Sequence, residues 1–470
     1  MLLAVAVLTA AVGLTGSGER IDAFTEPDAG SRKRVLLIGG LDGSAESAAQ
    51  VQQQFKKLVG SKTVAYSQIP LANPGKATLT FPPVGEAYAK QPESHYLWRY
   101  IATQAPDLVV IIGADPAHLG DALQKEAAAE VGTIPTTTKV PTGAIATSPA
   151  RAEMNRRLAR SRQQVAAQLA VPYGHELKEA VYIPAVALIA RLRMGALADV
   201  ENIVAPYFTG AKNSMEKATS SHLSGHLIFA DLAERTGKPR YVELVRAAAD
   251  MAFNADGQMK EAMPLHNEMS DSVFMGTPIL VKAGKLTGEQ RYYDMAIRHM
   301  RFMQQLCLRK DGIYRHSPLD ETAWGRGNAF PAIGLALSLE SLPKTHSGYN
   351  EMLSAFQKHI GALSKYQDET GMWREVIDMP GSYREFTATA MIAVSMIKGI
   401  RNGWLPAKQY QPMVDKAWVA INGRISTTGG LIDVCTSTGK QKSLQDYLDR
   451  TAILGIDPRG GAMALLFATE

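Results

Sequence analysis

Four polar segments of the sequence place acidic, basic and aromatic side chains directly before apolar stretches; they cover residues 266–271, 314–330, 371–378 and 382–391. Asp271 ends the first segment and precedes an apolar run that contains Met275. A carboxyl group in such a place is able to give a proton to a bound molecule and take one back, which is general acid and base chemistry. The alternative is structural, because an acid in the first turn of a helix also stabilises the helix dipole.

The aromatic residues of these segments indicate a carbohydrate ligand. Sugars stack their apolar faces on aromatic rings, and Trp324, Phe330 and Trp373 all lie beside charged residues. A carboxylate on the sugar favours a guanidinium fork, which Arg326 or Arg374 supplies. The alternative is that the two tryptophans belong to the core.

Two histidines complete the set of candidate residues. His316 lies in the second polar segment, and His222 lies in a polar stretch before another apolar run. Each is able to bind a sugar hydroxyl or a carboxylate, but each could equally be a structural histidine with its hydrogen bonds satisfied.

The elements that must position these residues are helices. Amphipathic patterns predict helices over residues 185–204, 222–236, 241–253, 272–283, 290–309, 330–342, 349–366, 387–401, 411–422 and 460–469. Helices that recur in pairs are typical of a closed (α/α)6 barrel or of an open helical solenoid. The polar and aromatic residues concentrate at the helix starts, where a barrel has its mouth, so the pattern favours the barrel.

These segments resemble the unsaturated glucuronyl and rhamnogalacturonyl hydrolases, which are glycoside hydrolase families 88 and 105. The resemblance covers residues 183–470 and rests on residues 271–278, 324–330, 372–376, 385–391 and 457–462. It implies an (α/α)6 barrel without a metal or another cofactor. The implied substrates are oligosaccharides that polysaccharide lyases leave with a 4,5-unsaturated uronic acid at the non-reducing end.

The resemblance also implies a role for each candidate residue. Asp271 would protonate C4 of the double bond and help a water molecule add at C5, after which the hemiketal opens and the glycosidic bond is lost. Arg326 would meet the uronate carboxylate, and His316 a hydroxyl or the carboxylate. The other residues expected at the substrate are Trp324, Phe330, Trp373, Met275, Glu385 and His222.

Two departures from the family pattern leave alternatives open. No acid lies within residues 220–223, where the family often carries a second one, and Phe330 stands where relatives often have tryptophan. One alternative is an exo-acting uronidase on saturated glucuronides, with Glu385 or Glu268 as the second carboxylate. The others are a lyase on the same barrel and a carbohydrate-binding helical toroid without catalysis.

Residues 30–170 predict a separate α/β domain. Apolar runs at 35–38, 63–66 and 107–113 are typical of strands, and Ser44 is expected to cap a helix that ends near Leu58. Residues 133–142 predict an exposed loop and residues 151–168 a polar-faced helix. Residues 171–182 are expected to link this domain to the barrel.

This α/β domain carries a second resemblance, in residues 38–44 and 71–75, to the zinc carboxypeptidases. That family has a histidine and a glutamate three residues apart after the first strand. Leu41 and Ser44 stand at these positions, and neither side chain binds zinc. The resemblance implies a domain without metal or hydrolysis, which shapes or shields the helical domain.

The amino terminus and the overall composition limit location and partners. Residues 1–18 carry no charge, which predicts an export signal and a periplasmic or secreted protein; the alternative is a buried first strand or helix. The chain is 46% apolar and 20% charged, with a net charge of +5 and no basic run, so it is neither disordered nor suited to nucleic acid. No other stretch suits a membrane span. The partner that the first resemblance implies is an oligosaccharide, and the sequence does not indicate the oligomeric state. Cys307 and Cys435 are expected to be buried free thiols.

Overall fold

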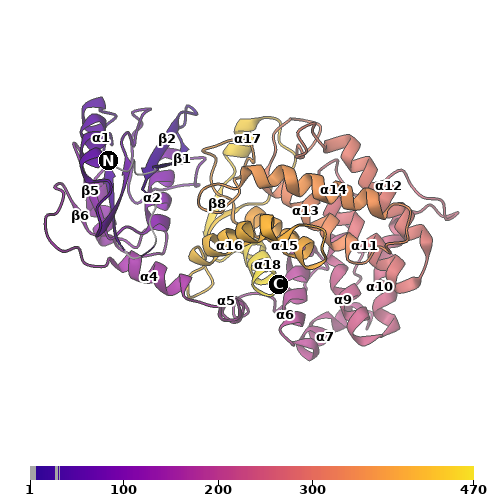
Figure 1. Ribbon diagram of the computed structural model, residues 1–470. Helices are drawn as coiled ribbons and strands as arrows, with labels where there is room; N and C mark the ends of the chain where they lie inside the picture. Colours follow the sequence, from indigo (N-terminus) through magenta and orange to yellow (C-terminus); the bar gives the residue numbers. More distant parts are fainter. Residues whose placement is uncertain (1–6, 27–29, 31) are drawn as a thin grey trace.

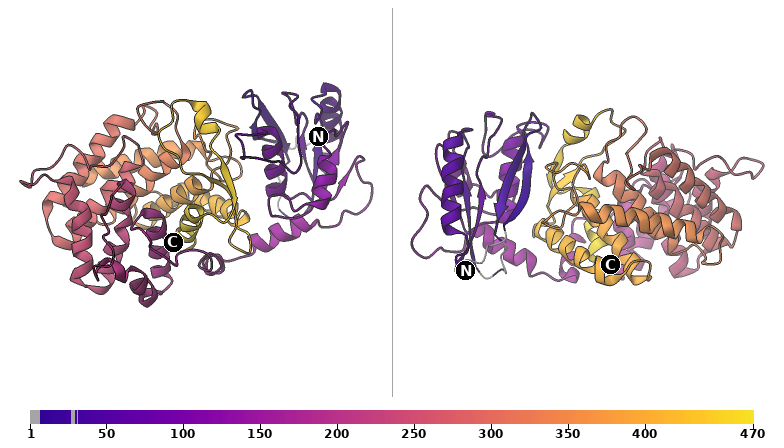
Figure 2. Two further views of the ribbon diagram at one scale, coloured as in Figure 1. Left: turned by 180° about the vertical axis from the view of Figure 1, so that it is seen from behind. Right: turned by 45° about the horizontal axis from the view of Figure 1, so that its top comes forward.

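The computed structural model describes residues 7–26, 30 and 32–470, which form two domains that lie side by side (Figure 1). A sheet domain holds the amino-terminal part of the chain, and a helical domain holds the carboxyl-terminal part. Helices α4 (Pro149–Leu158) and α5 (Arg162–Leu169) run from one to the other. The views from behind and from a tilted direction show the same arrangement (Figure 2).

One mixed sheet forms the centre of the first domain. Its strands, in spatial order, are β1 (Leu8–Leu14), β2 (Arg20–Thr25), β4 (Val64–Ile69), β3 (Lys33–Ile38), β5 (Leu108–Ile111) and β6 (Thr136–Thr137). Strands β4, β3, β5 and β6 run parallel, whereas β1 and β2 are antiparallel to their neighbours. The apolar strands β3 and β5 lie in the middle of the sheet, where both faces are covered, so their sequences show no polar alternation.

The predicted elements of this domain are confirmed in outline. The strand predictions correspond to β3, β4 and β5, and Ser44 caps α1 (Ala45–Leu58), since its side chain accepts a hydrogen bond from the N–H of Ser47 at 3.4 Å. Helices α2 (Pro92–Gln104) and α3 (Leu119–Lys125) complete the domain. The two segments of the second resemblance meet, because the side-chain amide of Asn73 donates to the carbonyl of Leu41 at 3.1 Å. Kinship with zinc carboxypeptidases itself stays a prediction.

The uncharged amino terminus is part of this fold. Residues 8–14 form strand β1, in which residues 10–14 are buried, as the alternative of a buried first strand expects. The carbonyl of Ala11 accepts hydrogen bonds from Arg384 at 3.2 Å and Arg374 at 3.4 Å. The helical domain thus covers an edge strand that would otherwise present unpaired backbone groups. Residues 1–6 of the predicted signal lie outside the described residues.

Inner helices of the second domain form a closed ring. They are α6 (Tyr182–Arg193), α8 (Ser220–Gly225) followed by α9 (Leu227–Thr236), α11 (Ser272–Thr287), α13 (Gly325–Leu339), α15 (Phe386–Arg401) and α18 (Pro458–Ala468). Each packs on the next, and α18 packs on α6, which closes the ring. Their sequences are apolar on most sides because neighbours surround them, as expected for buried helices.

Outer helices surround this ring. They are α7 (Leu197–Val204), α10 (Pro239–Ala249), α12 (Gln290–Cys307), α14 (Tyr349–Leu363) and α16 (Ala407–Gly423), and α5 covers α18. Short 3-10 turns lie at Ala205–Tyr207, Asp250–Ala252 and Ser364–Tyr366. One outer helix runs back between successive inner helices, so the inner helices all start at the same end of the ring.

The predicted helices are confirmed, with differences at particular residues. The helix expected over 185–204 is two helices, because Gly195 has a φ of 89° and ends α6. The helix expected over 151–168 is also two, because Ser161 forms a capping box that starts α5. The helix expected from residue 330 begins at Gly325, which places Arg326 inside its first turn.

Three elements between α16 and α18 were not predicted. Strands β7 (Leu431–Cys435) and β8 (Ala452–Gly455) form an antiparallel ribbon, and the short helix α17 (Leu444–Leu448) lies between them. This ribbon lies on the side of the helical domain that faces the sheet domain (Figures 1 and 2).

The two domains meet through buried polar contacts. Arg99 of α2 forms an ion pair of 2.5 Å with Asp433 of β7, and the Tyr88 hydroxyl donates to the same carboxylate at 2.9 Å. Residues expected to form a linker are also packed, since the Tyr173 hydroxyl donates to the carbonyl of Gly429 at 2.8 Å. In the described part of the chain, no helix is both long and apolar enough to cross a bilayer.

Candidate active site

Three inner helices begin with an acid at the N-cap position, and only one of these acids leaves its helix uncapped. Glu385 accepts a hydrogen bond from the N–H of Ala388 in α15, and Asp457 accepts two from the first turn of α18. Asp271 has helical backbone angles and makes no side-chain capping bond to α11. Because an N-cap acid normally satisfies free N–H groups, the carboxylate of Asp271 is available for something else.

The carboxylate of Asp271 faces His316. Its Oδ1 lies 3.3 Å from Nε2 of His316, and Asp271 is 8% exposed while His316 is fully buried. The contact lacks hydrogen-bond geometry, and both atoms have no hydrogen-bond partner among the described residues. Buried polar atoms are rarely left in this state, so the pair indicates a place that a polar ligand fills.

Tyr447 and Trp324 hold the imidazole of His316. The Tyr447 hydroxyl of α17 lies 2.9 Å from Nδ1, and the Trp324 ring packs against the imidazole with 4.5 Å between ring centres. When the Tyr447 hydroxyl donates to Nδ1, the proton of a neutral His316 is on Nε2, the atom that faces Asp271. The unpredicted segment between β7 and β8 therefore completes this part of the site.

Trp324 connects the histidine to a buried acid. Its Nε1 donates to Oε1 of Glu375 at 2.9 Å, and the thiol of Cys435 donates to the same oxygen at 3.1 Å. Burial, together with the nearby charge of Glu385, raises the pKa of Glu375 to about 8, although Arg326 lowers it. Glu375 is consequently protonated at neutral pH. Both cysteines are free and buried, as predicted.

The raised pKa of Glu375 gives a testable pH dependence. Between the unfolded pKa near 4.5 and the folded pKa of about 8, the native state holds a proton that the unfolded state has lost. The free energy of unfolding should therefore fall as pH rises through this window, by about 1 kcal/mol per pH unit for this one group. Glu375→Gln keeps the oxygen that accepts from Trp324, so its unfolding free energy should fall less between pH 5.5 and 7.5, as measured by urea denaturation. Equal slopes for both proteins would show that Glu375 ionises normally.

Arg326 is occupied by contacts within the protein. Its guanidinium donates to the carbonyl groups of Cys435 at 2.9 Å and Thr436 at 2.7 Å, and it lies 4.6 Å from the centre of the Trp324 ring. Burial lowers the pKa of Arg326, but the electrostatic effects of Cys435 and Glu385 raise it and outweigh burial, so the net shift is upward. Arg326 fixes the carboxyl end of β7 in this structure.

Arg459 is the arginine at this end of the ring with unused donors. It follows Asp457 and Pro458 at the start of α18. Its Nη2 pairs with Asp457 at 3.2 Å, whereas its Nε and Nη1 are buried without a partner among the described residues. The phenol of Tyr182 lies within electrostatic range of three charged groups at this end of the ring. Burial raises the pKa of Tyr182, and the charges of Arg326, Asp271 and Arg459 all act on it. Arg459 was not among the residues predicted for the site, although it lies in the stretch 457–462 that carries the resemblance.

The other predicted residues fall into two groups. Phe330 and Trp373 are buried: Phe330 stacks on Phe274 with 5.5 Å between ring centres, and Nε1 of Trp373 donates to the carbonyl of Leu363 at 2.8 Å. Both placements favour the core alternative over sugar stacking. Glu385 is likewise fully buried, and its carboxylate also accepts hydrogen bonds from the Thr387 hydroxyl and the N–H of Cys435.

Met275 and His222 lie at the open end of the ring. Met275 accepts a hydrogen bond from Ser224 through its sulfur at 2.9 Å, which joins α11 to α8. His222 caps α8 with Thr219, burial lowers its pKa, and it lines a cavity of about 370 Å³ together with Lys178 and Glu179. Asp271 does not line that cavity.

Metal ligation has no candidate group in the described ranges: no cluster of three or more His, Cys, Asp or Glu side chains is placed to hold an ion. The arginine alternative from the sequence, Arg374, is committed to the domain interface, where it pairs with Asp368 at 3.2 Å.

Comparison with known proteins finds relatives of this chain. Unsaturated rhamnogalacturonyl hydrolase YesR of Bacillus subtilis is 22% identical over 265 residues, which are 52% of this chain and 74% of that protein. An unsaturated 3S-rhamnoglycuronyl hydrolase of Formosa agariphila is 26% identical over 169 residues, which are 32% of this chain and 45% of that protein.

Solved structures show the same helical fold. A family 105 glycoside hydrolase of C. acetobutylicum superposes with a TM-score of 0.54 at 19% identity, covering 66% of this chain and 98% of that one. A possible family 105 member from Klebsiella pneumoniae gives a TM-score of 0.54 at 24% identity, covering 71% and 95%. The model of Glycosyl Hydrolase Family 88 matches residues 193–470, more than half of the chain. The chain therefore belongs to Glycosyl Hydrolase Family 88 and is a glycoside hydrolase.

Proposed function

We propose that this enzyme removes a terminal 4,5-unsaturated uronic acid from oligosaccharides by hydrating the double bond, with Asp271 as the general acid and base. The observation that carries the proposal is the Asp271–His316 pair, 3.3 Å apart, buried and without hydrogen-bond partners among the described residues. The closed ring of paired helices has the form of an (α/α)6 barrel, whose mouth is the end where these residues lie.

The proposed reaction needs one carboxyl group. Asp271 gives its proton to C4 as the double-bond electrons form the new C–H bond, which leaves positive charge at C5 shared with the ring oxygen. Water adds at C5 and returns a proton to the Asp271 carboxylate, so the aspartic acid is regenerated. The resulting hemiketal opens to a C5 ketone and leaves a hemiacetal at C1. This hemiacetal collapses to an aldehyde, and its hydroxyl proton passes to the glycosidic oxygen, so the departing sugar leaves as an alcohol.

The hydrogen-bond inventory favours this route over a two-carboxylate mechanism. Glu385, one candidate second acid, is fully buried and caps α15, so its oxygens are occupied. Glu268, the other, has a side chain that is 59% exposed and lies 3.8 Å from Lys440. Saturated uronidases need two opposed carboxylates at the bond they cleave, and neither residue is placed as such a partner of Asp271.

Further residues supply binding. Nε2 of His316 is suited to donate to a sugar hydroxyl or carboxylate, and the unused donors of Arg459 are suited to the uronate carboxylate. We assign that carboxylate to Arg459 rather than Arg326, because Arg326 already donates to backbone carbonyls of β7. Export of the protein stays a prediction.

The experiment that tests the function uses two substrates. Oligosaccharides cut by a polysaccharide lyase carry the conjugated double bond, whose ultraviolet absorbance disappears on hydration. We expect this absorbance to fall when wild-type enzyme is added. We also expect that the enzyme leaves the same oligosaccharides intact when their terminal uronate is saturated. Release of saturated uronate without change in absorbance would establish the uronidase alternative, and binding without any turnover would establish the non-catalytic one.

A further inference from the structure

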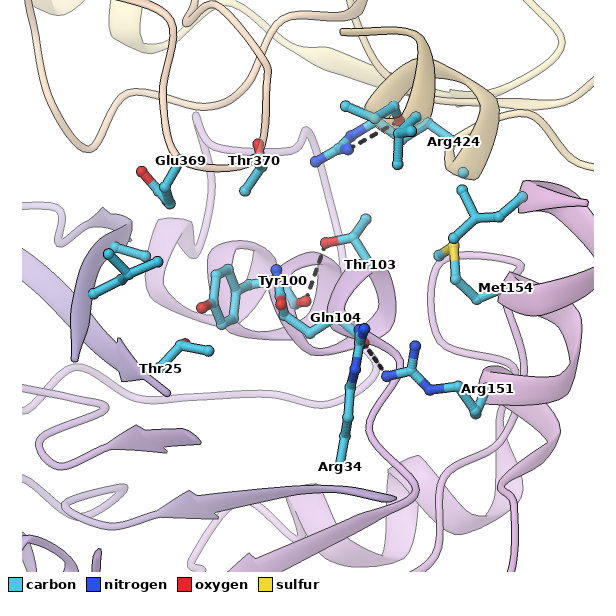
Figure 3. A pocket seen from close by; sticks show the side chains of 16 residues that line it. Thr25, Arg34, Tyr100, Thr103, Gln104, Arg151, Met154, Glu369, Thr370 and Arg424 are labelled. Atoms are coloured by element: carbon cyan, nitrogen blue, oxygen red, sulfur yellow. Dashed lines mark hydrogen bonds between the residues drawn. The ribbon is translucent and has the colours of Figure 1, made fainter. Parts of the chain in front are cut away.

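A cavity of about 310 Å³ lies between the two domains (Figure 3). Its lining residues fall within 8–158 and 369–424, and Asp271 is not among them. The walls of the cavity come from β1, β2, β3 and α2 of the sheet domain, from α4, and from residues 369–370 and the end of α16 in the helical domain. This volume is at the lower end of the range of about 300–1,000 Å³ that is usual for small-molecule sites.

Arg424 brings an unbalanced charge to this cavity. It is 7% exposed, and the one side-chain hydrogen bond that it makes among the described residues runs from Nη1 to the carbonyl of Ala420 at 3.2 Å. Its Nε is buried without a partner, and no carboxylate of the described residues lies within ion-pair distance of it. Figure 3 shows the side chain reaching from the end of α16 toward Thr370 and Thr103. A buried guanidinium without an anion is costly, so an anion from outside the chain would stabilise it.

The acids whose charges act on Arg424 are already paired. Asp433 is bound to Arg99 at 2.5 Å and to the Tyr88 hydroxyl, and Asp368 is bound to Arg384 at 2.5 Å. Glu369 lines the opposite wall and pairs with Arg384 at 2.6 Å. None of these acids is therefore free to neutralise Arg424.

Two more arginines and several hydroxyl groups line the same space. Figure 3 shows Arg34 and Arg151 converging near Gln104, and Arg151 donates to the carbonyl of Gln104 at 2.9 Å. Thr25, Thr103 and Thr370 add hydroxyls, and Leu8, Ala10 and Met154 add apolar surface. This mixture suits a ligand with one carboxylate, several hydroxyls and an apolar ring face.

We infer that the cavity between the domains is a second ligand site, which binds a carboxylate-bearing sugar of one or two rings with its carboxylate on Arg424. The pairing expected is a charge-assisted bidentate contact, which a guanidinium makes with a carboxylate. The site is separate from catalysis, because no residue that lines it contacts Asp271 or His316. The choice of a uronate as the sugar rests on the proposed function.

Calorimetric titration of the full-length Asp271→Asn protein tests this site without turnover. The probes are D-glucuronate, D-glucose and inorganic phosphate. We expect glucuronate to bind, glucose to bind at least about tenfold more weakly because it lacks the carboxylate, and phosphate to bind more weakly than glucuronate. Adding Arg424→Gln should weaken glucuronate by about tenfold or more, whereas the matched exposed-arginine variant Arg246→Gln should change nothing.

A second pair of variants keeps the test independent of folding. Leu158 ends α4, is 40% exposed and lines the cavity, so Leu158→Trp should fill the space without removing a buried contact. Leu197→Trp on α7, where the leucine is 36% exposed, is its control. Glucuronate binding should be lost in the first and kept in the second.

Several results would overturn the inference. Glucuronate affinity that is unchanged in both Arg424→Gln and Leu158→Trp would place binding elsewhere. Equal affinity for glucose would remove the carboxylate from the recognition, and tighter Arg424-dependent binding of phosphate would identify an inorganic-anion site instead. Failure of the proposed function is seen separately, because it is a loss of turnover on unsaturated oligosaccharides and not a loss of glucuronate binding.

Discussion

Asp271→Asn should lower kcat on unsaturated oligosaccharides by about 10²–10⁴-fold, the range that a general acid and base contributes. Asparagine has the same shape but carries no transferable proton. The midpoint of thermal unfolding should stay close to that of the wild-type enzyme, because Asp271 makes no capping bond that the substitution would break. The measurement is the initial rate of absorbance loss, together with thermal denaturation of both proteins.

A variant of another N-cap acid serves as the comparison for Asp271→Asn. Asp457 accepts hydrogen bonds from the N–H groups of Arg459 and Gly460 at 2.9 Å each, so Asp457→Ala should cost about 1 kcal/mol of stability through the lost cap. Asp415→Asn on the exposed side of α16 is the neutral control. If Asp271→Asn retained more than a tenth of the wild-type rate, or lost as much stability as the Asp457 variant, Asp271 would be a structural acid and the proton would come from another group.

Local signals in the sequence were sufficient to predict the helices, and they also single out Asp271 as a candidate. Apolar periodicity and glycine stops give the inner and outer helices, and the polar segment before α11 marks Asp271 as unusual. Sequence spacing does not say whether an N-cap acid actually caps. Glu385 and Asp271 look alike in sequence, and only the backbone angle at Asp271 and the donors around Glu385 separate them.

What the sequence could not predict depends on contacts between distant residues. Tyr447 reaches His316 across 131 positions of sequence, and β7 carries no pattern that distinguishes it from a loop. The aromatic residues show the same limit. Trp324 and Trp373 have similar polar neighbours in sequence, yet Trp324 contacts His316 and Trp373 is enclosed by α14 and α15. The structure of the amino-terminal apolar run could not be predicted for the same reason. It forms β1 because it pairs with β2 and packs against the helical domain.

Arg99→Met should show that the sheet domain supports the active site. It would leave the Asp433 carboxylate buried without its cation, and breaking one partner of a buried pair costs about 3–5 kcal/mol. Asp433 also has a φ of 68°, a conformation that a residue with a side chain adopts when its surroundings hold it there. Urea denaturation measures the loss, and the double variant with Asp433→Asn should recover part of it because no uncompensated charge remains.

The same substitution should also lower activity in molecules that stay folded. Two residues after Asp433, the N–H of Cys435 donates to Glu385 at 2.9 Å and its carbonyl accepts from Arg326 at 2.9 Å, so a shift of β7 moves the residues around Trp324. We expect kcat to fall about tenfold, equivalent to about 1.4 kcal/mol, at a temperature where the protein is fully folded. The control is Arg301→Met, which breaks an exposed ion pair with Glu351 and should cost about 0–1 kcal/mol. Equal effects of Arg99→Met and Arg301→Met on stability and rate would mean that the sheet domain does not position β7. A larger effect of Arg99→Met on both stability and rate would mean that the sheet domain supports catalysis by holding β7 in place, without a catalytic residue of its own.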